Sequence, residues 1–301
     1  MTKFRRNHQT RGRSHTQGFV FRSILYVIFI LIVLFVLFKF IKTVQGSIYD
    51  SFETPDSVDA LFYLPDGSNG QVIDHGYYQL AYNEKREQAD WVAYVLKREE
   101  LKMPNVKRSR KYFSDPEVWG KSAHHKDYSN SGYTRGHLAP AGDMAHTEDA
   151  MRTSFYMSNM TPQLRAFNNG IWKELEESAR DWAFKNNELI IITGPIFDTN
   201  YPKQIGRANV AVPDRFFKII LDIEKPDYKA IAFVIPNESS EQLLQEYAVT
   251  IDEVENLTGF DFFNDLLDDE EEEALESKFD LQKWSFSDKR YNLRITKWNQ
   301  S

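Results

Sequence analysis

The chain has 301 residues, 42% of them hydrophobic and 14% aromatic, which allows one large domain or two small ones with a substantial core. It contains no cysteine, which excludes disulfides and thiolate metal sites, so a metal would need oxygen or imidazole ligands. Residues 1–49 hold eight basic side chains and no acid, which leaves 29 basic against 44 acidic side chains in the remainder. A remainder this acidic, formally −15, excludes binding of a polyanion through the overall field and would require a local basic cleft with a bound cation.

The first predicted element is an apolar segment at residues 23–42, uninterrupted from Ile24 to Phe38. Counted through a snorkelling Lys39 to Ile41 it reaches 18 residues, near the lower limit of the roughly 17–25 residues that span a bilayer. The basic segment 1–22 predicts a cytoplasmic N-terminus. We therefore expect a single-pass anchor at 23–42, with the following domain on the periplasmic or extracellular side.

Two alternatives for this segment stay open. It could be a cleavable signal peptide, with Val44 and Gly46 as small residues before Ser47, although the run is long and no Ala-x-Ala site follows. Residues 1–22 are also free of acid and contain Arg, Ser and Thr, as in a mitochondrial presequence. That composition would place the protein at the mitochondrial inner membrane instead.

The patterns of a compact mixed domain begin after a juxtamembrane linker at 43–70 and extend to residue 298. Alternation predicts a strand, spacing of three and four residues predicts a helix, and continuous apolar runs predict central strands covered on both faces. The segments concerned are a strand at 71–82, a mixed segment at 87–101, a helix at 168–185, and apolar runs at 189–197, 209–223 and 229–237. This order of strands, helix and further strands predicts an α+β fold.

Two segments close the domain. Residues 239–259 open with serines and predict a serine-capped short helix followed by a second element. Residues 265–278 are a charge run, which is typical of a solvated helix or loop, and we assign it no function.

The chemistry centres on an Arg-Gly-His triplet in the run SGYTRGHLAPAGDM, residues 131–144. Gly136 allows a tight backbone geometry that brings the side chains of Arg135 and His137 toward one cleft. If the segment from Asn168 is helical, Glu176 and Arg180 follow it by eight and twelve residues, which at about 100° per residue puts all three on one side of the helix.

An amide, a carboxylate and a guanidinium on one face suit a hydrated divalent cation and a phosphate. The alternative is a solvated salt-bridged stripe, with Glu176 and Arg180 as an i,i+4 pair. A locally basic patch, KRSRK at 107–111, is either part of the same cleft or a solvated loop.

The runs GYTRGHLAPAGDM and SNMTPQLRAFNNGIWKELEESAR together resemble the DNA/RNA non-specific endonuclease family, over about residues 70–298. That family includes secreted bacterial nucleases and mitochondrial endonuclease G and has a ββα-metal site. The resemblance implies a central, mostly antiparallel sheet flanked by helices. It also makes His137 the general base, Asn168 the direct Mg²⁺ ligand and Glu176 the holder of the cation's water shell, with Mn²⁺ as a possible substitute.

The same resemblance assigns the arginines. Arg180 and Arg110 would neutralise the pentavalent phosphate, with Arg108 as a neighbouring candidate for the second role. Arg135 would assist on the phosphate or shape the loop. One departure is Thr134, where the family usually has Asp; Asp143 could compensate for it or could cap the next turn.

The resulting expectation is a membrane-anchored, Mg²⁺-dependent endonuclease that cuts DNA and RNA through their backbones with little sequence preference. It would bind the membrane through 23–42, and it could form a homodimer, as members of the family often pair. The alternatives are a membrane-tethered nucleic-acid-binding module weakened in catalysis, and a phosphodiesterase acting on small nucleotides or lipid head groups.

Overall fold

The computed structural model describes residues 64–224, 228–264 and 269–300, together with residues 33 and 39. The chain divides into two compact units, residues 1–58 and 59–301. The predicted segments 1–22 and 23–42, and most of the predicted linker, lie outside the described residues. No described helix has the length and apolar character needed to cross a bilayer.

A seven-stranded sheet forms the centre of the second unit, and every neighbouring pair in it is antiparallel. This confirms the predicted α+β fold with a central antiparallel sheet. In spatial order its strands are β1 (Gln71–Asp74), β2 (Gln79–Asn83), β3 (Gln88–Lys97), β6 (Glu188–Ile196), β9 (Arg215–Asp222), β10 (Lys229–Pro236) and β11 (Ala248–Val249).

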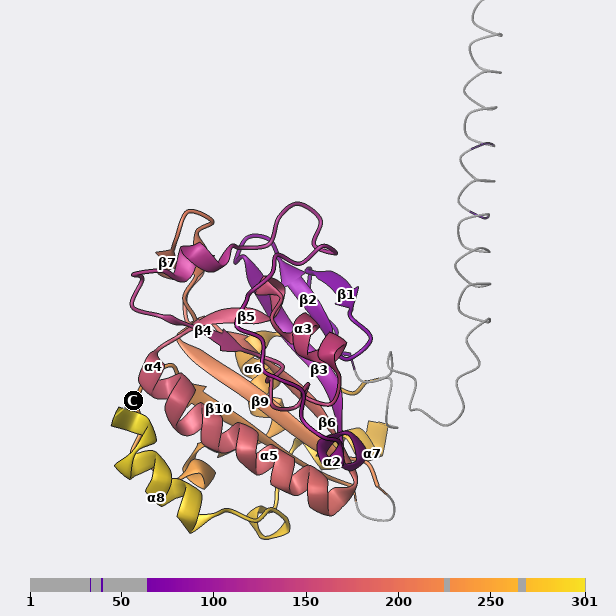
Figure 1. Cartoon of the computed structure of the whole chain (residues 1–301). Helices are drawn as coiled ribbons and strands as arrows, with labels where there is room; N and C mark the ends of the chain where they lie inside the picture. The colour runs from indigo at the N-terminus through magenta and orange to yellow at the C-terminus, as the bar shows by residue number, and fades with distance from the viewer. Residues whose placement is uncertain (1–32, 34–38, 40–63, 225–227, 265–268, 301) are drawn as a thin grey trace, which may run out of the picture. The chain divides into compact units, whose positions relative to one another are not determined.

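Helices cover both faces of this sheet, because β6, β9 and β10 are apolar on both sides. Figure 1 shows the long helix α5 (Lys173–Asn186) crossing one face and α6 (Ile251–Thr258) behind the other. The other α-helices in the described part of the chain are α2 (Arg98–Lys102), α3 (Glu148–Ser154), α4 (Arg165–Phe167), α7 (Asp269–Glu276) and α8 (Asp288–Thr296). Shorter turns are η1 (His125–Tyr128), η2 (Met157–Asn159), η3 (Asn168–Trp172), η4 (Leu244–Tyr247), η5 (Leu281–Lys283) and η6 (Trp298–Gln300).

Three expected elements differ in detail. The segment 71–82 is a hairpin rather than one strand, because Gly76 takes a φ of +77° and turns the chain between β1 and β2. The run 209–223 is interrupted between β8 (Val210–Ala211), which pairs with β7 (Gln204–Ile205), and β9. No helix begins at the predicted serine cap, and Thr250 caps α6 instead, by accepting a hydrogen bond from the Glu253 N–H.

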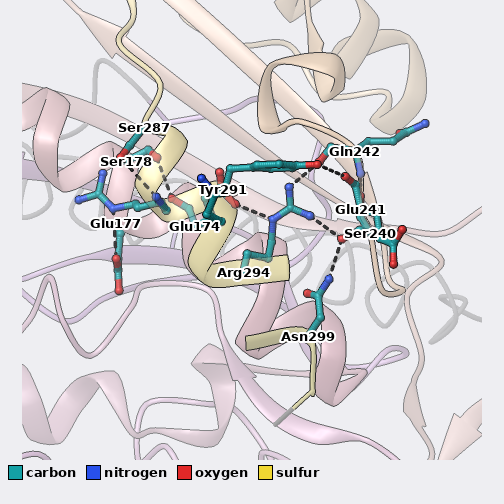
Figure 2. A network of polar contacts seen from close by, with 12 residues as sticks. Glu174, Glu177, Ser178, Ser240, Glu241, Gln242, Ser287, Tyr291, Arg294 and Asn299 are labelled. Atoms are coloured by element: carbon teal, nitrogen blue, oxygen red, sulfur yellow. Dashed lines mark hydrogen bonds and ion pairs between the residues drawn. The ribbon is translucent and has the colours of Figure 1, made fainter. Parts of the chain in front are cut away.

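The C-terminal helix α8 is fastened to α5 through a buried arginine, shown in Figure 2. Arg294 is fully buried and donates to Glu174 Oε2 at 2.5 Å, to the Ser240 carbonyl and to the Gln242 carbonyl. Asn299 adds a hydrogen bond to the same Ser240 carbonyl at 2.9 Å. The C-terminal segment therefore holds α5 in place, and α5 carries part of the site described below.

Candidate active site

The Arg-Gly-His triplet lies on a short strand pair next to the main sheet. Strand β4 (Thr134–His137) pairs antiparallel with β5 (Met160–Gln163), with His137 opposite Met160. Gly136 is required by packing, because a Cβ there would lie 2.0 Å from Gln163 Oε1. The chain then continues through α4 and η3 into α5, so two strands and a helix frame the site.

His137 is buried, with only 7% of its surface exposed. The His137 and Phe155 rings are T-shaped to each other, with their centroids 4.7 Å apart. The His137 Nε2 has no hydrogen-bond partner among the described residues. Burial, together with the nearby Arg108 guanidinium, lowers the pKa of His137 to about 3. The imidazole is therefore neutral at physiological pH in the protein alone.

The loop that follows His137 is held by buried polar side chains. The Asn159 side chain accepts from the Ala139 N–H at 2.8 Å and donates to the Ala139 carbonyl at 3.0 Å. Asp143 accepts from Arg180 Nη1 at 2.7 Å and from the Tyr94 hydroxyl at 2.7 Å. Asp143 thus positions Arg180, while the Thr134 hydroxyl bonds to other residues, Gln163 and Asn168.

The helical segment from Asn168 starts irregularly. Gly170 leaves the helical region, with φ −97° and ψ −112°, and η3 is a π-type turn that precedes α5. Despite this kink, Asn168, Glu176 and Arg180 all line one pocket, as their spacing predicts.

That pocket has a volume of about 270 Å³. His137 from the end of β4 joins the three helical residues in lining it. Its wall consists of Arg108, His137, Pro140, Ala141, Gly142, Asn168, Asn169, Lys173, Glu176 and Arg180.

Thr134 orients the Asn168 amide. Asn168 Nδ2 donates to Thr134 Oγ1 at 2.9 Å, and the same hydroxyl donates to the Gln163 carbonyl at 2.8 Å. Because the amide nitrogen is engaged, Oδ1 is the atom of this side chain left available to a cation. Thr134 therefore supplies an acceptor at the position where the family pattern has Asp.

A buried charge that does not line the pocket also acts on Glu176, and the sequence patterns did not reveal it. Lys218 of β9 is fully buried, its Nζ lies 4.9 Å from the centre of the Trp172 ring, and within the described residues it has no hydrogen-bond partner. Burial raises the pKa of Glu176 to about 7, against the opposing effect of Arg180 and Lys218. The sequence signal for Lys218 is a charge flanked on both sides by apolar residues in the middle of β9, RFFKIILD.

Two of the predicted arginines lie elsewhere. Arg108, not Arg110, lines the pocket, with its guanidinium 5.2 Å from the Phe155 ring, and Arg110 is exposed on the same loop. Arg135 is not part of the pocket wall; it donates to the His125 carbonyl and stacks on Tyr112. Arg135 thus contacts the segment around His125 and Tyr112, and its role stays a prediction.

The donor set fits a hard, hydrated divalent cation. Asn168 Oδ1 and the Glu176 carboxylate offer oxygen ligands, and the pocket contains no cluster of three carboxylates or imidazoles. Mg²⁺ is held in this way, by few protein groups and several waters, whereas Zn²⁺ prefers a closed set of nitrogen or sulfur ligands.

Comparison with known proteins agrees with this architecture. The model of the DNA/RNA non-specific endonuclease family matches residues 61–269. Nuclease C1 of Cunninghamella echinulata var. echinulata is 34% identical over 229 residues, which cover 71% of this chain and 90% of that protein. The mitochondrial nuclease of Saccharomyces cerevisiae is 35% identical over 60% of this chain and 61% of its own length.

A similar solved structure is that of the EndoG/EndoGI complex, in which EndoG is inhibited. It matches with a TM-score of 0.65 and 27% identity, covering 72% of this chain and 95% of that chain. The chain spans only about 60% of some curated relatives, such as the mitochondrial nuclease EXOG of Danio rerio, of which it covers 58%.

Proposed function

Since this chain belongs to the DNA/RNA non-specific endonuclease family, we propose that it is a Mg²⁺-dependent endonuclease whose catalytic pocket is the one around His137. Family membership makes it a metal-dependent nuclease that hydrolyses phosphodiester bonds of DNA and RNA. The observation that carries the assignment of the site is that His137, Asn168, Glu176 and Arg180 converge on one pocket.

His137 is the proposed general base. It is buried at the pocket wall and neutral at physiological pH, and its unpartnered ring nitrogen is the atom that would accept a proton from an attacking water. The T-shaped contact with Phe155 and the clamped loop that follows hold the ring in place.

Asn168 and Glu176 are the proposed cation ligands, Asn168 directly and Glu176 through water, with Mn²⁺ as a substitute for Mg²⁺. When bound, the cation would offset the charge that develops on the phosphate and the leaving oxygen. The amide is oriented by Thr134, and the charges of Arg180 and Lys218 favour the ionised carboxylate against burial, which raises the pKa of Glu176 to about 7.

Arg180 and Arg108 are the proposed phosphate ligands. Arg180 is held at the pocket wall by its ion pair with Asp143. Arg108, from the basic loop 107–111, lines the same pocket. Both would contact the nucleic-acid backbone, which carries no base information, so little sequence preference is expected.

Cleavage of a supercoiled plasmid and of a long RNA by the purified chain tests this proposal. We expect cutting of both with Mg²⁺, none with EDTA, and a loss of at least about 100-fold for His137→Ala, the range for removing a general base. Arg108→Ala should reduce kcat/KM about 10- to 100-fold, while the matched control Arg110→Ala, in the same loop, stays within about threefold.

Three outcomes would contradict it. Cutting that persists in His137→Ala would remove the assigned base. Binding of nucleic acid without cleavage under any divalent metal would favour the weakened binding module. Turnover of dinucleotides but not of long substrates would favour the small-molecule phosphodiesterase.

We further propose that residues 23–42 anchor the enzyme, with the N-terminus cytoplasmic and the nuclease domain on the periplasmic or extracellular side. The support is the apolar run from Ile24 to Phe38 and the basic segment before it. The test is alkaline carbonate extraction with protease accessibility: an anchored chain stays in the membrane pellet with its domain digested only from outside. Release of a shortened chain would indicate a signal peptide, and recovery in mitochondria would indicate the inner-membrane alternative.

A further inference from the structure

Three carboxylates from two helices converge on the side of the sheet opposite the pocket. Asp252 and Glu255 belong to α6 and Glu276 ends α7, and one oxygen of each lies within 4.8 Å of the others. Asp252 and Glu255 are three residues apart and so share a face of their helix. The apolar side chains of the same two helices, such as Leu275, pack in the core cluster on this face, away from the cluster that contains α5.

The carboxylate of Glu276 is buried and incompletely satisfied. The residue is 7% exposed, and its Oε1 has no hydrogen-bond partner among the residues that the structure describes. Glu255 Oε1, in contrast, accepts from the Phe262 N–H at 2.9 Å. A buried carboxylate oxygen without a donor costs free energy comparable to a lost hydrogen bond, or more, so this position calls for a partner.

The local charge is one-sided. Glu272 and Asp261 also act on Glu276, and neither Asp252, Glu255 nor Glu276 forms an ion pair with a described lysine or arginine. Burial and the surrounding carboxylates raise the pKa of Glu276 to about 8. Glu276 is moreover the last residue of α7, where the helix dipole disfavours an anion. A bound cation would offset both the repulsion among these carboxylates and the unfavourable interaction of Glu276 with the helix dipole.

We propose that Asp252, Glu255 and Glu276 bind a hard divalent cation of the size of Ca²⁺, which links α7 to α6. Ca²⁺ takes six to eight oxygen ligands in flexible geometry, whereas Mg²⁺ demands a near-ideal octahedron and gives up its waters reluctantly, so a loose set of three carboxylates suits Ca²⁺ better. Asp252 and Glu255 are half-buried, which leaves room for water ligands. Because α7 has the sequence DEEEEALE and buries little apolar surface apart from Leu275, the ion would supply much of its attachment.

Calorimetric titration of the metal-free chain with Ca²⁺ tests this site. The measurement is made in an Asn168→Ala background, which removes the proposed ligand of the catalytic cation. We expect one Ca²⁺ per chain, an affinity for Mg²⁺ at least about tenfold weaker, and a higher thermal unfolding midpoint with Ca²⁺. Glu276→Gln should weaken Ca²⁺ binding at least about tenfold, and the matched control Glu273→Gln, exposed on the same helix, should not change it.

Because the pKa of Glu276 is raised to about 8, the side chain is mostly protonated at neutral pH without metal, and Glu276→Gln replaces it by a neutral amide of similar shape. The metal-free variant should therefore unfold no earlier than the parent chain, and lost binding is then distinguishable from misfolding. Asp252→Asn is the second variant and should weaken Ca²⁺ binding in the same direction. The proposal is overturned if the Asn168→Ala chain binds no Ca²⁺, if both variants bind it unchanged, or if Mg²⁺ binds as tightly. None of these outcomes bears on the catalytic pocket, because plasmid cleavage by Glu276→Gln with intact Asn168 is expected to equal that of the parent chain.

Discussion

The hydrogen bond between Thr134 and Asn168 gives the sharpest test of how the cation ligand is positioned. Thr134→Val keeps the shape of the side chain but removes the hydroxyl, and with it the 2.9 Å bond from Asn168 Nδ2 and the 2.8 Å bond to the Gln163 carbonyl. Each bond contributes about 0.5–1.5 kcal/mol net, so we expect the unfolding free energy to fall by about 1–3 kcal/mol.

The larger effect should be on cation affinity. A bond of about 1 kcal/mol that orients the amide corresponds to about a fivefold change in affinity, and partners that orient metal ligands typically contribute roughly 10- to 100-fold. We therefore expect the Mg²⁺ concentration for half-maximal plasmid cleavage to rise about tenfold in Thr134→Val. Cleavage at saturating Mg²⁺ should recover to within several-fold of the parent chain, because the ligand itself is still present.

Two matched variants separate hydrogen bonding from packing. Thr134→Ser retains the hydroxyl and Thr134→Asp supplies a carboxylate acceptor, so both should keep the half-maximal Mg²⁺ concentration within about threefold of the parent value. If Thr134→Val requires no more Mg²⁺ than Thr134→Ser, the threonine does not position Asn168 and the reasoning fails.

Three further perturbations test the electrostatics and the attachment of α8 to α5. On the acid side, kcat/KM should fall with a midpoint near pH 7, because the pKa of Glu176 is raised to about 7. His137, whose pKa is lowered to about 3, stays neutral in this range. If this acid limb of the pH profile were unchanged in Glu176→Gln, the assignment would be wrong. Lys218→Met removes a charge that favours the ionised Glu176, so that limb should move to higher pH, and a move to lower pH would exclude the assigned role. Arg294→Met leaves Glu174 buried without its partner and should destabilise the fold by about 3–5 kcal/mol in urea denaturation; a loss below about 1 kcal/mol would show that α8 does not hold α5 in place.

The parts of the site that the sequence predicted are those governed by local periodicity. The helical spacing of Asn168, Glu176 and Arg180 brings them to one pocket even though Gly170 interrupts the helix, because the kink lies between the first residue and a regular α5. Continuous apolar runs likewise matched β6 and β10 closely, since a strand covered on both faces must be apolar along its whole length.

The parts that sequence reasoning missed depend on packing between distant segments. Lys218 acts on Glu176 only because β9 packs against η3, where the Lys218 ammonium group lies 4.9 Å from the centre of the Trp172 ring. Arg108 and Arg110 are equivalent as a sequence pattern, and the choice between them follows from the position of Phe155, which is set by α3. The sequence pattern shows that Thr134 stands where the family usually has Asp. It does not show the hydrogen-bond partner of Thr134, because Asn168 lies 34 residues away along the chain.

The low pKa of His137 has a consequence for how the base could operate. An imidazole with a pKa of about 3 accepts a proton poorly, and its pKa is lowered by burial and by Arg108, a side chain proposed to bind phosphate. A phosphodiester in the pocket would bring a negative charge near the ring and would neutralise Arg108. At a separation of about 5 Å and an effective dielectric constant of about 20, that charge contributes about 3 kcal/mol toward the protonated imidazole, enough to bring the pKa of His137 most of the way back to its ordinary value. Burial is the main cause of the low pKa and Arg108 adds to it, so a bound phosphate would act by offsetting both, and His137 would be a better base toward water while a phosphate occupies the pocket.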